Sequence, residues 1–255
     1  MHAKPDLIVL PYSPWSEKAR WALDHHRVPY QLHVYMPMLH EPWLRLRTRK
    51  FRGRVSVPTL MSDAGVFRDS FDIAREAERI GEGEKLFPAD HLDEISSWND
   101  RSDRALRAAR VHVIARMGQV PGAEAEGLTF LPRALRSPLR ATARTAVNFL
   151  RRKYDVENDL EASQRAMRAE LEKLRNALGN KPYLLDDLTY ADITMAVVLQ
   201  PILPVAKEFI RLGPATREVW TNHELAREFA DLTEWRDSLY AKHRRPPGAI
   251  SAAAS

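Results

Sequence analysis

The first eighty residues alternate between short apolar runs and amphipathic helical patterns. The run from Leu7 to Leu10 predicts a buried strand, and Ser13-Pro14 opens a predicted helix whose apolar residues recur on one face. Residues 30–34 predict a second strand. A strand–helix–strand unit with so short a connection should have parallel strands and a right-handed crossover.

Two further strands are predicted at residues 57–61 and 66–67. They flank the sequence Ser-Asp-Ala-Gly at 62–65, whose composition is typical of the turn in an antiparallel hairpin. Asp69 then supplies capping chemistry for a helix that runs through Ile80. The predicted order is therefore βαβ followed by ββα.

From Leu92 onward the sequence shows helical periods and no convincing strand. Residues 81–83, Gly-Glu-Gly, form a natural linker before this change. We therefore expect an α/β domain over 1–83 and an all-helical domain over 92–245, with a frayed tail from His243 onward. The helices are expected at 92–117, 133–152, 159–178, 190–200, 203–211 and 223–242.

The composition narrows the chemistry. A chain of 255 residues fits one large domain or two packed ones, and 44% hydrophobic with 29% charged residues is typical of a soluble globular protein. Cysteine is absent, which excludes disulfides and any mechanism in which the protein supplies its own sulfur nucleophile. The histidines lack metal-ligand spacing and no Gly-rich phosphate loop occurs, so we expect no metal and no nucleotide site.

The hydrophobic runs also bear on localisation. None approaches the roughly 18 consecutive apolar residues that a membrane-spanning helix requires. The N-terminus lacks the longer apolar core and small-residue cleavage site of a signal peptide. We expect a cytoplasmic protein without a membrane span.

The formal net charge of +5 is concentrated in one part of the chain. Residues 120–153 hold seven bases against two acids, which is +5 by itself. Arg136, Arg140 and Arg144 recur at i+4 and form one helix stripe over part of the segment 133–153. The stripe is either a solvated face or a site for an acidic partner or anionic ligand. Few aromatic residues lie among these bases, so we expect no nucleic-acid binding.

Three short motifs could carry chemistry or only structure. Ser13 lies at a strand-to-helix turn, where a helix N-terminus favours an anion, but Ser followed by Pro is also an ordinary helix start. Asp69-Ser70 has the same two interpretations. Pro58 requires Val57 to be extended.

Taken together, these motifs resemble one family. The segments SPWSEKARWALD from residue 13, VPTL from 57, DS at 69–70 and LTYADI at 188–193 occur in the order and spacing of the cytosolic glutathione transferase superfamily. This resemblance implies a thioredoxin-like N-terminal domain, an all-α C-terminal domain and a homodimer. In the LTYADI segment, Thr189 and Asp192 fit a capping box that serves folding.

The resemblance assigns the catalytic role to Ser13. Glutaredoxin-like relatives have a CPxC motif where this chain has Ser13-Pro14-Trp15-Ser16, so both sulfurs are replaced by hydroxyls. The chain therefore resembles serine-type transferases, in which a hydroxyl activates the thiol of bound glutathione. Ser16, one helical turn later, and the neighbouring Tyr12 are alternatives.

The same resemblance implies how glutathione, the co-substrate, would bind. The backbone of Val57, before a cis Pro58, would pair with the cysteinyl unit, and Asp69 with Ser70 would hold the γ-glutamyl end. The family more often has Glu-Ser there, and the shorter Asp69 departs from this pattern. Candidates for the glycyl carboxylate come from the poorly patterned region 35–54. They are His40, Lys50 and Arg54.

A second pocket for a small hydrophobic electrophile is expected between the domains. Its candidate residues are Pro11, Tyr12, Trp15, Met36, Met38, Arg104, Ala108 and His112. The predicted activity is that of a detoxifying glutathione S-transferase. A glutathione-dependent isomerase, dehalogenase or peroxidase, and a noncatalytic protein that binds glutathione or a hydrophobic ligand, are the alternatives.

Overall fold

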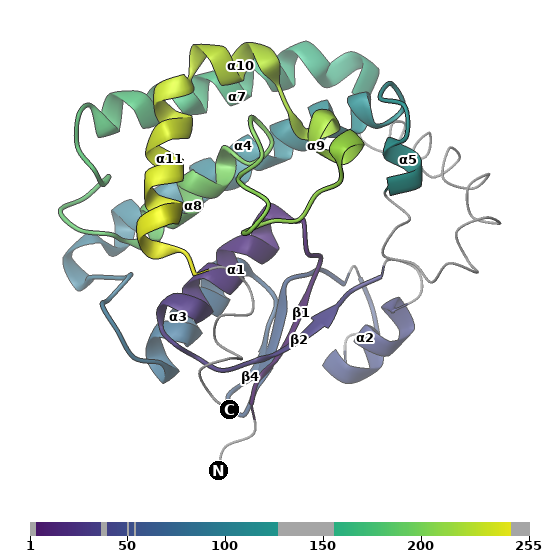
Figure 1. Cartoon of the computed structure of the whole chain (residues 1–255). Coiled ribbons are helices and arrows are strands. Elements are labelled where there is room, and N and C mark those ends of the chain that lie inside the picture. Colours follow the sequence, from purple (N-terminus) through teal and green to yellow (C-terminus); the bar gives the residue numbers. More distant parts are fainter. Residues whose placement is uncertain (1–3, 37–39, 50, 54, 127–155, 246–255) are drawn as a thin grey trace. The chain divides into compact units, whose positions relative to one another are not determined.

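The computed structural model describes residues 4–36, 40–49, 51–53, 55–126 and 156–245 (Figure 1). By their contacts, the residues form two compact units, each made of segments that are distant in sequence. The sheet unit comprises Met1–Asn99, Leu185–Val197 and Leu239–Ser255, and the helical unit comprises Asp100–Leu184 and Val198–Ser238. The expected domain boundary in the linker after residue 80 stays a prediction.

The sheet unit begins with the predicted βαβ and ββα order. Its elements are β1 (Asp6–Val9), α1 (Pro14–His25), β2 (Gln31–Val34), α2 (Glu41–Thr48), β3 (Thr59–Ser62), β4 (Gly65–Phe67) and α3 (Ser70–Ile80). The strands form one sheet in the order β2-β1-β3-β4. The α/β thioredoxin-like prediction is thus confirmed, and α2 is an element that the sequence pattern missed.

The register of the sheet matches the sequence predictions. β1 pairs in parallel with β2, with Leu7 opposite Leu32, as predicted for a strand–helix–strand unit. β1 also pairs antiparallel with β3, with Leu7 opposite Leu60, and β3 forms the predicted hairpin with β4, with Leu60 opposite Phe67. Gly65 has a φ of 137° in the hairpin turn, a conformation that side chains with a Cβ rarely adopt.

The core of the sheet unit lies around β1. Leu7, Ile8 and Val9 are 0% exposed, as expected for an inner strand covered on both faces. α1 packs against α3, and α2 lies on the opposite side of the sheet (Figure 1). The sheet therefore has helices on both faces, and β1 leads directly from this core into α1.

An aromatic cluster in the same unit involves Phe71 at the start of α3. The ring centroid of Phe71 lies 5.3 Å from that of Phe87, and the ring of Phe87 stacks on Tyr190 at 5.1 Å. Tyr190 begins α8 (Tyr190–Val198), and its N–H donates to the carbonyl of Leu86. The cluster joins α3 to α8.

The predicted capping box before α8 is present in part. The Thr189 N–H donates to Oδ2 of Asp192 at 2.8 Å, which is the reciprocal half of the box. The Thr189 hydroxyl also donates to Oδ2, at 3.0 Å, instead of capping the helix backbone. Both side chains are buried, and this motif serves folding.

Over the described parts of the chain, the remaining elements are helical. They are η1 (Ala89–His91), α4 (Leu92–Met117), α5 (Ala123–Glu126), α7 (Val156–Leu178), α9 (Pro214–Trp220), α10 (His223–Glu228) and α11 (Ala230–His243). Inside the helical unit, Glu170 of α7 accepts hydrogen bonds from Arg101 and Arg104 of α4 and from Lys173. The all-α prediction for this region is confirmed. Within the described residues, no helix is both long and apolar enough to cross a membrane.

Several predicted helices differ from the structure. The prediction at 203–211 is wrong, because arginine side chains bond the backbone there: Arg236 donates to the carbonyl of Leu203, and Arg217 donates to that of Val205. The long helix expected at 223–242 is interrupted at Phe229, and α9 was missed. The helix expected at 133–152 and the arginine stripe at 133–153 lie outside the described residues.

Candidate functional site

Three segments that carry candidate residues reach the same end of the sheet. β1 ends where the Leu10–Ser13 turn begins, and β3, which is antiparallel to β1, begins directly after Val57-Pro58. β4 is antiparallel to β3 and ends just before Asp69-Ser70. The register alone therefore brings Ser13, Val57 and Asp69 to one edge.

Ser13 takes the N-cap position of α1 without using its side chain as a cap. Its φ and ψ are −73° and 128°, its N–H donates to the carbonyl of Leu10 at 2.9 Å, and its hydroxyl makes no capping hydrogen bond. The residue is half-buried. Ser13 therefore occupies the N-cap position, as predicted, but its hydroxyl does not cap the helix and can donate to another acceptor.

Ser16 is in a different situation. It is 0% exposed, and its Oγ accepts a hydrogen bond from the Leu10 N–H at 3.2 Å. This hydroxyl holds the Leu10–Ser13 turn from within the core. Ser16 is therefore a structural residue, which leaves Ser13 as the serine of the motif with an available hydroxyl.

The Val57-Pro58 peptide bond is cis, as predicted from the resemblance. Pro58 is buried and Val57 is partly exposed. The backbone of Val57 lies just before β3, beside the end of β1. An extended peptide could pair with it there.

Asp69 and Ser70 form the N-terminus of α3. Oδ1 of Asp69 accepts a hydrogen bond from the Phe71 N–H at 2.8 Å, so the carboxylate caps the helix. Asp69 is exposed, while Ser70 is 2% exposed. One carboxylate oxygen of Asp69 thus accepts a hydrogen bond from the helix backbone. The side chain is also exposed to solvent, at the same edge of the sheet as Ser13.

The candidates for a glycyl carboxylate are only partly described. His40 precedes α2, and its Nδ1 lies 3.1 Å from the Val34 carbonyl oxygen and 3.3 Å from the Met36 nitrogen. The Val34 carbonyl requires Nδ1 to carry the ring hydrogen and donate, whereas the Met36 N–H requires Nδ1 to accept, so the two contacts belong to alternative tautomers. In the second tautomer the ring hydrogen is on Nε2, which can donate to a ligand. Lys50 and Arg54 lie outside the described residues.

The residues expected in the second pocket come from both units. Tyr12, Trp15 and Met36 belong to the sheet unit and are partly exposed, and Met38 lies outside the described residues. Burial raises the pKa of Tyr12, so its phenol stays protonated at neutral pH. The grouping of these residues with His112 stays a prediction.

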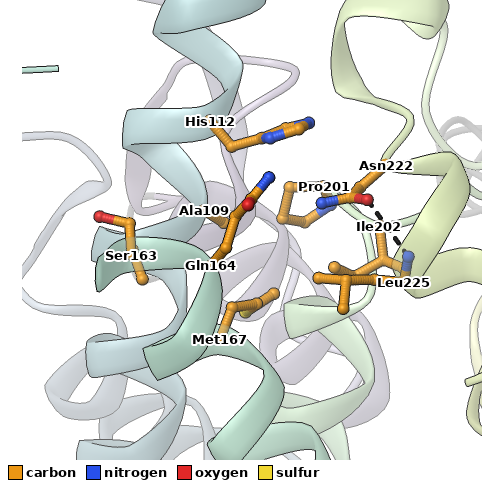
Figure 2. A pocket seen from close by; sticks show the side chains of 10 residues that line it. Ala109, His112, Ser163, Gln164, Met167, Pro201, Ile202, Asn222 and Leu225 are labelled. Atoms are coloured by element: carbon orange, nitrogen blue, oxygen red, sulfur yellow. Dashed lines mark hydrogen bonds between the residues drawn. The ribbon is translucent and has the colours of Figure 1, made fainter. Parts of the chain in front are cut away.

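His112 lines a small pocket made wholly of helical-unit residues. Figure 2 shows the imidazole of His112, from α4, and the amide of Gln164, from α7, pointing into the same space. The empty volume is about 240 Å³, part of it open to solvent. The other lining residues are Ala108, Ala109, Ser163, Met167, Pro201, Ile202, Asn222 and Leu225.

The imidazole of His112 is neutral at physiological pH. Burial, and after it the positive charge of Arg116, lower the pKa of His112 to about 4. Its Nε2 is buried without a hydrogen-bond partner among the described residues. The pocket therefore offers one unused imidazole nitrogen within a largely apolar lining.

The sequence patterns did not reveal a buried charge cluster beside α1. Glu17 is 0% exposed, Asp24 is 6% exposed, and both pair with Arg244, which follows α11 and is 4% exposed. Burial alone would raise the pKa of Glu17, but Arg20 and Arg244 outweigh it and hold that pKa below its usual value. The signal in the sequence was the presence of Glu17, Arg20 and Asp24 on a helix that also has a buried apolar face.

Comparisons with known proteins agree with this architecture. The sequence model of "Glutathione S-transferase, N-terminal domain" matches residues 12–80. No curated protein sequence matches the chain.

Solved structures match nearly the whole chain at low sequence identity. The beta-etherase LigF from Sphingobium sp. strain SYK-6 is similar with a TM-score of 0.63 and 18% identity, covering 98% of both chains. A glutathione S-transferase from Methylobacterium radiotolerans, in complex with glutathione sulfonate, has a TM-score of 0.58 and 17% identity over 99% of this chain and 94% of the other. A family member from Pseudomonas fluorescens Pf-5, with bound S-(propanoic acid)-glutathione, has a TM-score of 0.58 and 16% identity over 95% and 100%.

The fold is thus a thioredoxin-like sheet followed by a helical region, as in the glutathione transferases. Residues 12–80 match the glutathione S-transferase N-terminal domain, and the chain shares its fold with solved glutathione transferase structures. The resemblance recognised in the sequence is confirmed at this level.

Proposed function

We propose that the protein binds glutathione and activates its thiol for attack on a small hydrophobic electrophile. The observation that carries this proposal is the state of Ser13: a hydroxyl at the N-terminus of α1 that its own helix does not use. The complexes of two structural neighbours with glutathione derivatives support the choice of co-substrate.

The binding mode follows the edge of the sheet. The backbone of Val57 pairs with the cysteinyl unit, and the exposed carboxylate of Asp69 meets the ammonium of the γ-glutamyl end while Ser70 and the α3 N-terminus receive its carboxylate. The Nε2 of His40 is our described candidate for the glycyl carboxylate, with Arg54 as a further one. The thiol then lies at the Leu10–Ser13 turn.

The energetics favour hydroxyl donation from Ser13. A free thiol with a pKa of about 8.5 is only about 3% ionised at pH 7. Lowering that pKa by about two units requires roughly 2.7 kcal/mol in favour of the thiolate. A helix N-terminus contributes about 0.3–1 kcal/mol, whereas a hydrogen bond to a charged group contributes about 1.5–3 kcal/mol. Ser13 acts by stabilising the sulfur of glutathione, not as a covalent nucleophile.

Other reactions would use the same thiolate. A glutathione-dependent isomerase, dehalogenase or peroxidase differs from a transferase in the substrate that the glutathione thiolate attacks. The neighbour named as a beta-etherase adds aryl ethers to the compounds worth testing. A noncatalytic protein that binds glutathione would keep Asp69 and Ser70 but would not ionise the thiol. We further propose a detoxifying role, a homodimer and a cytoplasmic location, as the resemblance implies.

Titration of the protein with glutathione, followed by thiolate absorbance near neutral pH, tests the proposal. We expect saturable absorbance with glutathione and none with S-methylglutathione, which binds through the same ends but has no ionisable thiol. Saturable binding of both, without thiolate absorbance, would select the noncatalytic protein. Substrate profiling with haloarenes, peroxides and aryl ethers then separates the reaction types.

The assignment of Asp69 has its own test. Asp69→Asn keeps an oxygen that can cap α3 but removes the charge that meets the ammonium. We expect glutathione affinity to fall about tenfold while the pKa of the bound thiol stays unchanged, because the site is remote from sulfur. Equal affinity of Asp69→Asn and the parent would remove Asp69 from the binding site.

A further inference from the structure

The end of α11 is tied to α1 by a buried arginine within the sheet unit. Nε of Arg244 donates to Oε1 of Glu17 at 2.7 Å, and Nη1 donates to Oδ2 of Asp24 at 2.5 Å. Arg244 and Glu17 are separated by 227 positions in sequence. All three side chains are almost fully buried, so the guanidinium spans two turns of α1 without solvent between the charges.

One arm of this cluster continues to the Leu10–Ser13 turn. Glu17 also accepts a hydrogen bond from Nη2 of Arg20, and the same Nη2 donates to the carbonyl of Pro11 at 3.3 Å. Pro11 is the second residue of the turn that ends at Ser13. A continuous chain of polar contacts therefore runs from Arg244 through Glu17 and Arg20, which are buried, to the partly buried backbone beside Ser13.

The other arm ends elsewhere. Oδ1 of Asp24 accepts a hydrogen bond from the Tyr30 hydroxyl at 3.0 Å, near the start of β2. This arm shares Arg244 with the first arm but makes no contact with the turn in the part of the chain that the structure describes. A substitution in the Tyr30 arm therefore changes the packing of α1 without removing a contact to the turn, whereas a substitution in the Arg20 arm removes such a contact.

We propose that Arg244 is a positioning residue for the Ser13 hydroxyl, acting through Glu17 and Arg20 on the carbonyl of Pro11. The role rests on the proposed function, because Ser13 matters only if it meets the glutathione sulfur. Displacement of a reacting group by about 1 Å can cost about a hundredfold in rate. A segment beyond the last helix thereby controls the geometry at the start of the first one.

The test uses three variants of the full-length chain. Arg244→Met removes the charge that joins both arms, Arg20→Gln breaks only the link to Pro11, and Tyr30→Phe is the matched control on the arm that ends away from the turn. Two amides report the turn directly: the Ser13 N–H, which donates to Leu10, and the Leu10 N–H, which donates to Ser16. Hydrogen exchange is measured at both, together with the pKa of bound glutathione.

We expect exchange at these two amides to become about tenfold faster in Arg244→Met and Arg20→Gln, and to stay within twofold of the parent in Tyr30→Phe. The bound thiol pKa should rise by about one unit in the first two variants only. Unchanged exchange in Arg20→Gln, or equally faster exchange in Tyr30→Phe, would overturn the proposal. If Arg244→Met does not fold, Arg244→Lys, which keeps the charge without the planar fork, takes its place with the same expectation.

The two readouts distinguish this proposal from the proposed function. Faster exchange without any thiolate in the parent would contradict the function but uphold the control of the turn by Arg244. A parent that ionises glutathione, with exchange at the turn unaffected by Arg20→Gln, would uphold the function and reject the positioning role.

Discussion

The charge cluster beside α1 in the sheet unit and the pocket around His112 in the helical unit bury titratable groups in opposite ways. Beside α1, two arginines and two carboxylates are enclosed together, and every one of them has an oppositely charged partner. In the helical unit, an imidazole nitrogen of His112 is buried without a hydrogen-bond partner among the residues that the structure describes, and the ring avoids the cost of a buried charge by remaining neutral. The charge cluster holds the backbone of the Leu10–Ser13 turn in place, whereas the stability cost of burying His112 depends on pH.

The paired cluster should give the largest stability effect. Glu17→Gln leaves Arg20 and Arg244 buried with one carboxylate fewer, and removal of one partner from a buried ion pair costs about 3–5 kcal/mol. We expect the free energy of unfolding, measured with urea, to fall by that amount. Glu41→Gln, which breaks the exposed pair with Arg45, is the control and should cost less than about 1 kcal/mol. Equal losses would show that burial does not distinguish the two pairs.

A substitution of Arg236 tests whether a buried charged side chain in the helical unit also stabilises the backbone that it contacts. Its Nη1 donates to the carbonyls of Leu199 and Leu203, and the residue is 1% exposed. We expect Arg236→Met to lower the free energy of unfolding by about 2–4 kcal/mol, because buried carbonyls lose their donor. Proteolysis should then increase in the 199–213 loop. A stable variant with an intact loop would contradict this role.

His112 should give a smaller effect that depends on pH. Its pKa of about 4 lies below the ordinary value of about 6.5, so the unfolded chain binds the proton more readily. Stability is therefore unaffected above about pH 6.5 and falls progressively as the pH decreases to about 4, by roughly 1–3 kcal/mol. His112→Gln should flatten this part of the profile, because it removes the group that binds the proton only in the unfolded chain. Parallel profiles for the parent and His112→Gln would contradict the assignment.

The elements that the sequence predicted well are those whose pattern is local. The strand from Leu7 to Val9 is fully buried, so an unbroken apolar run is enough to predict it. The hairpin turn needs a positive φ at Gly65, so the glycine itself predicts the turn. The cis bond before Pro58 came from the family resemblance, since no local pattern distinguishes the isomers.

The features that the sequence missed depend on distant partners. The segment 203–211 looks helical by its spacing, but Arg217 and Arg236 bond its backbone from elsewhere in the helical unit. Arg244 looks like part of a frayed tail until Glu17 and Asp24 are brought beside it. The contrast between Ser13 and Ser16 was likewise hidden, because only the folded turn shows which hydroxyl is enclosed.

Replacement of Ser13 should barely affect folding. Its hydroxyl makes no capping bond, so Ser13→Ala should cost less than the roughly 0.5–2 kcal/mol that the loss of a working cap costs. Ser16→Ala is the informative contrast, because it removes the acceptor of the buried Leu10 N–H and should cost about 1–3 kcal/mol. A larger loss of unfolding free energy in Ser13→Ala than in Ser16→Ala would reverse the roles given to the two serines.

The pKa of glutathione bound to Ser13→Ala, read from thiolate absorbance across pH, tests the central claim most directly. Loss of a hydrogen bond to the sulfur should raise that pKa by about one to two units, with a ten- to a hundredfold fall in conjugation near neutral pH. A bound-thiol pKa equal to that of the parent, in a variant that still binds glutathione, would contradict the claim that Ser13 activates the thiol.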